Sequence, residues 1–135
     1  MANGTIAFDT LQTSGQITGT AKSVDTDYVV NGSAKAWCHW NQDSTQTIRD
    51  SLGISSLDDD GVGDSFLNYT NSMSDANYVN IVNGSHFIGT AGGSVAYNSD
   101  DQSTSKTSEI RALRTDTSAV YDSQTMQSVV MGDVT

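Results

Sequence analysis

Proline is absent from the 135 residues of this chain, so no turn can use the fixed backbone angle of a proline ring. Turns must instead be formed by glycine, asparagine and aspartate, which adopt left-handed backbone angles at low cost. The dipeptide Asn-Gly, a typical hairpin signal, begins at Asn3, Asn31 and Asn83. We therefore expect extended segments that are joined by short turns.

Cysteine occurs once, at Cys38, which excludes a disulfide within the chain. No apolar run approaches the roughly 18 residues that cross a bilayer. The opening sequence, MANGTIAFDT, has neither the basic nor the apolar region of a signal peptide. We therefore expect a soluble chain that is not secreted by a signal peptide and has no membrane partner. Its stability must come from packing within the chain or against other subunits.

Basic residues are scarce, since six Lys and Arg stand against sixteen Asp and Glu and give a formal net charge of −10. A surface with the sign of the phosphate backbone gains nothing from counterion release, so we expect no nucleic acid partner. Charged residues make up 16% and hydrophobic residues 36% of the chain. The polar remainder is mostly hydroxyl and amide side chains, which compete with helical hydrogen bonds and favour turns.

Short strand-like runs recur about every ten residues, which is the spacing of a β-sandwich or barrel. They lie at residues 4–13, 15–24, 34–41, 66–70, 77–82, 86–90, 94–98, 108–115 and 127–132, with shorter ones around Ile48 and from Ile54 to Leu57. Residues 98–108, NSDDQSTSKTS, contain no apolar side chain and are predicted to form an exposed loop. We predict an all-β fold, an antiparallel β-sandwich over residues 34–135, with an extended N-terminal attachment segment over residues 1–33.

The stretch AKAWCHWN, residues 34–41, holds both tryptophans, the cysteine and one of the two histidines. Alternate residues of a strand face opposite sides, so Lys35, Trp37 and His39 share one face. The opposite face consists of small apolar side chains and one large side chain. We predict that it points into the core, and it comprises Ala34, Ala36, Cys38 and Trp40.

Thiolate and imidazole are preferred zinc ligands, which makes Cys38, His39 and His86 candidates for a metal site. Neighbouring residues of a strand point to opposite faces, however, so Cys38 and His39 cannot easily bind one ion. We therefore interpret Cys38 as a buried thiol and expect no metal and no other cofactor.

The acidic stretch SSLDDDGVGD, residues 55–64, resembles a calcium-binding loop because its carboxylates cluster around a glycine. With Gly61 in the glycine position of an EF-hand, Ser56 and Leu67 occupy the first and last ligand positions, where Asp and Glu are required. A looser calcium or magnesium site stays open as an alternative. The favoured interpretation is a tight solvated turn at residues 58–61, whose charges discourage pairing at a sheet edge.

The known catalytic motifs do not match the sequence. Residues 92–96, GGSVA, miss the nucleophile-elbow pattern because Ala96 stands where glycine is needed. The two histidines form no ordered triad, and no phosphate-binding or dinucleotide-binding glycine motif occurs. We therefore predict that the chain is not an enzyme and has no catalytic residue.

Trp37 and His39 are candidates for contact with a ligand or partner, together with His86. An exposed aromatic ring offers a large apolar face at low entropic cost, so Trp37 and His39 could form a stacking platform for a sugar. The alternative is that Trp37 packs beneath a loop or against a neighbouring subunit.

Five short motifs follow one another along the chain, at Ala34–Trp37, Ile48–Ser51, Ser55–Leu57, Gly61–Asp64 and Asp75–Tyr78. In this order, AKAW, IRDS, SSL, GVGD and DANY resemble a module of tail-fibre, head-fibre and other virion surface proteins of tailed bacteriophages, notably those of marine cyanobacteria. The opening third and the ending MQSVVMGD are similar to the same group, so the likeness covers most of the chain. Residues 38–40 depart from the commoner residues of the module.

The resemblance implies a β-rich structural protein on the exterior of a virion, as a capsid decoration, head fibre or tail component. It also implies other virion proteins as partners and a homo-oligomer, such as a trimer. The alternative is a receptor- or glycan-binding tail-fibre tip, in which Trp37, His39 and the 86–106 loops contact a glycan of the host surface.

Overall fold

A computed structural model describes residues 10–13, 22–25, 30, 32–85, 94–98, 102–107 and 109–135. The chain divides into two compact units, Met1–Ser33 and Ala34–Thr135. In the first unit, β1 (Thr10–Thr13) pairs antiparallel with β2 (Lys22–Asp25). The remainder of the runs at 4–13 and 15–24 and the run at 86–90 lie outside the described residues. Within the described part of the chain, no helix has the length and apolar character needed to span a membrane.

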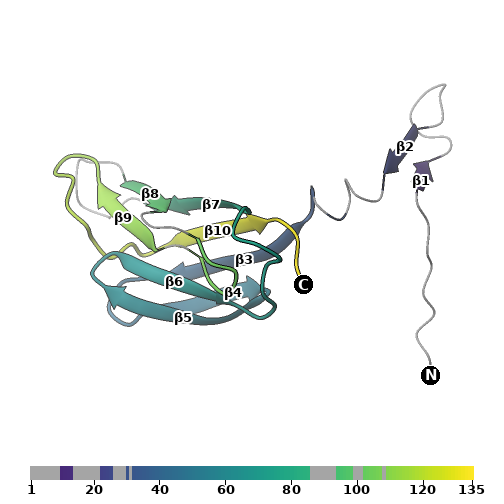
Figure 1. The fold of residues 1–135 in the computed structure, drawn as a ribbon. Coiled ribbons are helices and arrows are strands. Elements are labelled where there is room, and N and C mark those ends of the chain that lie inside the picture. Colours follow the sequence, from purple (N-terminus) through teal and green to yellow (C-terminus); the bar gives the residue numbers. More distant parts are fainter. Residues whose placement is uncertain are drawn as a thin grey trace. The chain divides into compact units, whose positions relative to one another are not determined.

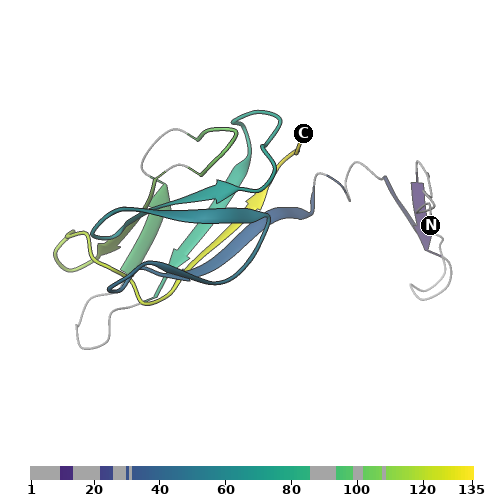
Figure 2. The same cartoon turned by 90° about the horizontal axis from the view of Figure 1, so that it is seen from below.

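The second unit is an antiparallel β-sandwich, which confirms the predicted all-β fold (Figure 1). One sheet has the strand order β4-β3-β10-β7, formed by Thr47–Leu52, Ala34–Asn41, Met126–Met131 and Val79–Gly84. The other has the order β5-β6-β9-β8, formed by Ile54–Gly61, Asp64–Tyr69, Ile110–Arg114 and Ser94–Asn98. The strand β10, yellow in Figures 1 and 2, pairs with β3 on one side and β7 on the other.

The core is built from the inward faces of the two sheets. On β3, Ala36, Cys38 and Trp40 have exposed fractions of 1%, 2% and 0%, which confirms the predicted alternation for these residues. Ala34 is exposed, contrary to the prediction, because it lies at the start of β3 beyond a register shift against β10. The residues buried in one cluster with Cys38 and Trp40 are Leu67, Ile110, Ala112 and Met126.

A buried polar cluster connects the end of β3 to β6. The Gln42 side-chain nitrogen, Nε2, donates to Ser65 Oγ and to the Gly63 carbonyl, both at 2.9 Å. Trp40 Nε1 donates to the same Ser65 Oγ at 3.3 Å, and Ser65 Oγ donates to Gln46 Oε1. Because these buried groups satisfy one another, the cluster stabilises one arrangement of the two sheets.

The prediction of an exposed loop at residues 98–108 holds for Thr104 and Ser105, which are exposed, but is wrong for Thr107, where the segment runs beside β6. Thr107 is only 1% exposed. Its backbone N–H donates to the Leu67 carbonyl, and Leu67 N–H donates to Thr107 Oγ1, each at 3.0 Å. The paired residues of β6 and β9 are limited to the Asp64 and Ser65 end of β6. The polar segment therefore hydrogen-bonds backbone groups of β6 beyond the reach of β9.

The predicted acidic turn at residues 58–61 is also wrong, because these residues complete β5 and the chain reverses at Val62 and Gly63. Gly63 in the reversal has a φ of +76°, and Gly61 at the end of β5 has a φ of +133°, values that other residues rarely adopt. The aspartates can stay in the strand because β5 is the edge of its sheet and exposes their side chains.

The Asn-Gly hairpin signal fails at Asn83, since Asn83 and Gly84 are the last two residues of β7. Cross-strand pairing with β10 continues through both residues. Tertiary pairing thus overrides the local turn preference of this dipeptide. The same signals at Asn3 and Asn31 fall outside the described residues.

Candidate functional site

Outward-facing side chains of the β4-β3-β10-β7 sheet form an apolar row that crosses all four strands. Trp37 of β3 is the direct cross-strand partner of Leu52 on one side and of Val129 on the other, and Val129 is in turn paired with Ile81. The exposed fractions of Leu52, Val129 and Ile81 are 53%, 39% and 55%. Direct partners on one face of a sheet contact each other, so these four residues, here named the apolar row, form a continuous strip.

A polar row lies beside the apolar row, two residues along each strand. The same registers align its members, which are Asp50, His39, Gln127 and Asn83. Asn83 Nδ2 donates to Gln127 Oε1 at 3.4 Å, and Arg49 Nη1 lies 3.5 Å from His39 Nε2. Arg49 also donates to Thr125 Oγ1 at 3.3 Å. The outer face of this sheet thus carries an apolar strip beside a polar strip and is not uniformly polar.

A cavity of about 280 Å³ lies where the two rows cross β3 and β10. It is lined by Trp37, Cys38, His39, Gln127, Ser128 and Val129. The structure therefore places Trp37 and His39 in one depression, while His86 lies outside the described residues. An apolar ring beside hydrogen-bonding side chains can contact either a sugar or the surface of another protein.

Cys38 is a free thiol. Although the residue is among those that line this cavity, it is buried and belongs to the core cluster. Burial, with a smaller effect of the Asp50 carboxylate, raises the pKa of Cys38 to about 12. A thiol in this state is a poor nucleophile and a poor metal ligand, because both roles need the thiolate. Among the described residues, no three His, Cys, Asp or Glu side chains are grouped so that they could hold a metal ion.

Of the three aspartates of β5, Asp59 is held by hydrogen-bond donors of the protein. Asp59 Oδ1 accepts a hydrogen bond from Gln46 Nε2 at 2.8 Å and one from the Gly61 N–H at 3.1 Å. Asp58 and Asp60 are exposed along the same edge strand. Charges in this position oppose the addition of a further strand to the sheet.

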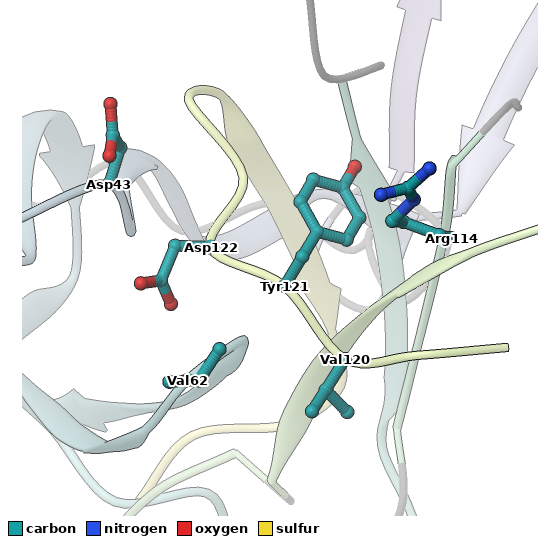
Figure 3. Close-up of a pocket in the computed structure, with 6 residues that line it drawn as sticks. All are labelled: Asp43, Val62, Arg114, Val120, Tyr121 and Asp122. Carbon is teal, nitrogen blue, oxygen red and sulfur yellow. The ribbon is translucent and has the colours of Figure 1, made fainter. Parts of the chain in front are cut away.

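A second cavity, of about 290 Å³, lies between the β5–β6 turn and the loops that follow β3 and β9 (Figure 3). Figure 3 shows Tyr121 and Arg114 on one side of it and Asp43 on the other. Arg114 forms an ion pair with Asp116 at 2.7 Å, and Tyr121 Oη donates to the Ser85 carbonyl at 2.7 Å. These polar groups hold loops in place. The full lining consists of Asp43, Val62, Arg114, Val120, Tyr121 and Asp122.

Sequence reasoning found Trp37 and His39 but not the rows to which they belong. The neighbours of these residues come from β4, β7 and β10, whose alignment depends on long-range pairing. The sequence did contain one local signal of the two rows. On each of three strands an apolar residue lies two positions from a polar side chain of the same face, and these apolar residues are Leu52, Ile81 and Val129. Comparison with known proteins adds no relative, since no family model, no curated protein and no solved structure matches the chain.

Proposed function

We propose that this chain is a structural protein on the exterior of a bacteriophage virion, as a capsid decoration, head-fibre or tail component. The observation that carries the proposal is the ordered set of motifs between Ala34 and Tyr78 that resembles virion surface modules. These motifs occupy strands and turns of the sandwich, which supports an architectural role and assigns no catalytic step to the chain.

Two motif residues illustrate this architectural role. Gly63, in the GVGD motif, has a left-handed backbone, and a Cβ at this position would lie 2.8 Å from the Tyr121 carbonyl oxygen. Tyr78, which ends the DANY motif, is 7% exposed. Its hydroxyl donates to the carbonyl oxygens of Ser103 and Lys106, at 3.1 and 2.8 Å. Both motif residues hold turns and loops of the sandwich in place, which supports an architectural role.

The distribution of charge supports the same proposal. The β5-β6-β9-β8 sheet carries the acidic strand β5, whereas the strands of the other sheet contain a single carboxylate, Asp50. An acidic outer surface does not adsorb packaged DNA. A charge-poor face suits contact with other proteins, because charged residues are depleted in the centres of protein interfaces.

Purified phage particles test the proposal. We expect mass spectrometry to detect this protein in particles after density-gradient purification, and immunogold particles to label intact virions. Antibody access without prior disruption of the particle distinguishes an exterior location from an interior one. Particles that lack the protein, or that are labelled only after disruption, would contradict the proposal.

A receptor- or glycan-binding module is the second candidate, and the observation that favours it is the cavity beside Trp37 and His39. In this case the labelled protein binds host cells, and Trp37→Ala abolishes the binding while the far-ultraviolet circular dichroism spectrum is unchanged. Val95→Ala, an exposed site 48% accessible on β8, is the matched control. Cell binding that is equal for both variants would exclude Trp37 as the contact.

A further inference from the structure

The apolar row remains open in the folded chain, and its four members lie on adjacent strands with no covering element among the described residues. Val79 of β7, which is 53% exposed, lies on the same face and extends the apolar surface beyond the row. We propose that a second copy of this chain packs face to face on the outer side of the β4-β3-β10-β7 sheet. This inference concerns the purified protein and is independent of the virion assignment.

Charge is the first argument for a second copy as the occupant. The chain has a net charge of −10, so most of its surfaces repel a second copy. The four strands of this sheet are the exception, because they contain one carboxylate, Asp50, with two basic residues, Lys35 and Arg49. Two such faces can approach without the repulsion that the acidic β5 would cause.

The cross-strand register supplies the second argument, because each of the two rows can pack against the same row of a second copy. A two-fold axis parallel to the strands and midway between β3 and β10 places Trp37 over Val129 of the second copy, and Leu52 over Ile81. The same axis places each polar row over the other. It brings His39 opposite Gln127 and Asp50 opposite Asn83, so that no carboxylate faces its own copy. Such reciprocal pairing of one patch with itself is the requirement of a two-fold interface.

The size of the face sets the expected strength of the contact. Four strands about 4.8 Å apart and about 20 Å long cover roughly 400 Å² per copy. A total of roughly 800 Å² is below the 1,200 to 2,000 Å² or so of a standard stable interface. We therefore expect a reversible dimer with a dissociation constant in the micromolar to millimolar range, which a high local concentration on an assembly would favour.

Sedimentation velocity of the full-length chain over a wide concentration range tests this inference. We expect the weight-average mass to rise from monomer toward dimer, and Val129→Lys to raise the dissociation constant at least about tenfold by placing a charge in the apolar row. Ile81→Lys, on the edge strand β7, provides a second variant should Val129→Lys disturb the fold. Val95→Lys adds the same charge to an exposed valine of the other sheet and should leave the dimer unchanged.

A mixing experiment tests the orientation of the two copies. Trp37→Glu and Val129→Lys should each be monomeric alone, whereas an equimolar mixture should form a heterodimer, because the axis places the introduced glutamate opposite the introduced lysine and leaves one native Trp37–Val129 contact. An axis that stacked Trp37 on Trp37 would give no such rescue.

The inference is overturned by a monomer at every concentration up to millimolar, by a dimer that Val129→Lys and Ile81→Lys leave intact, or by a mixture without a heterodimer. A monomer whose tryptophan fluorescence responds to a neutral oligosaccharide would overturn it in favour of a sugar site.

Discussion

Trp40 Nε1 donates a hydrogen bond to Ser65 Oγ across 3.3 Å, and this contact joins β3 of one sheet to β6 of the other at a fully buried position. The same oxygen accepts from Gln42 and donates to Gln46. A single hydroxyl of β6 thus satisfies three side chains from the end of β3 and the connection to β4. Its removal leaves the buried Trp40 Nε1 without its acceptor, which is more costly than the loss of an exposed hydrogen bond.

We expect Ser65→Ala to lower the free energy of unfolding by about 1 to 3 kcal/mol, the cost of leaving a buried donor or acceptor unsatisfied. Urea denaturation followed by tryptophan fluorescence measures the effect. Ser56→Ala, an exposed serine of β5 that accepts from Asn68, is the control and should change stability by less than about 0.5 kcal/mol. Equal losses for the two variants would show that the buried cluster adds nothing beyond its single bonds.

The two tryptophans of β3 provide a matched pair on one strand. Trp40 is fully buried, so Trp40→Ala should cost about 3 to 5 kcal/mol through lost burial and a residual cavity. Trp37 lies on the outer face, and Trp37→Ala should cost less than about 1.5 kcal/mol in the monomer. Denaturation at low protein concentration, where no dimer forms, measures both values. A larger loss for Trp37→Ala than for Trp40→Ala would reverse the assigned faces of β3.

The buried thiol makes stability depend on alkaline pH. Because burial raises the pKa of Cys38 from 9.0 to about 12, the folded chain retains a proton that the unfolded chain releases above pH 9. The stabilising contribution is therefore present below pH 9 and is lost as the pH rises toward 12. Between pH 8 and pH 10, the wild type should lose about 1 kcal/mol more than Cys38→Ala. Parallel curves for the two proteins would show that the folded thiol titrates normally.

Gly63 is the turn residue whose substitution should have the largest effect. A Cβ at this position would lie 2.8 Å from the Tyr121 carbonyl oxygen and 2.9 Å from the Tyr121 nitrogen, and its φ of +76° adds strain. We expect Gly63→Ala to lower the melting temperature by on the order of 10 °C. Gly32→Ala, where no atom lies within 4 Å of the added Cβ, should melt within about 2 °C of the wild type. Calorimetry or circular dichroism decides the comparison.

The charges of β5 should protect an open sheet edge. Replacement of Asp58, Asp59 and Asp60 by serine removes three charges from this edge strand, and we expect aggregation on mild heating, measured by light scattering. Asp43, Asp75 and Asp133, all exposed and outside the strands, give a control of equal net charge when they are changed to serine. Equal aggregation of the two variants would mean that net charge, and not its position on the edge, maintains solubility.

The inward alternation of Ala36, Cys38 and Trp40 was predictable because the period of a strand is a local property of the chain. The fold class followed in the same way from strand-like runs at regular spacing. The apolar row was not predictable, since its register depends on the pairing of β3 with β10 across most of the domain. Thr107 was misassigned for a related reason: a polar residue can lie in a protein interior when its hydroxyl and backbone hydrogen-bond a neighbouring strand.

The position of β10 between β3 and β7 has a consequence for biosynthesis. Neither of these two strands gains its shared neighbour until the ribosome has translated nearly the whole domain, so the sheet cannot form on the nascent chain as each segment emerges. A topology dominated by such distant pairings folds slowly, in milliseconds to seconds. During that interval Trp40 and its future neighbours are exposed together, and apolar surface exposed in this way is prone to aggregation.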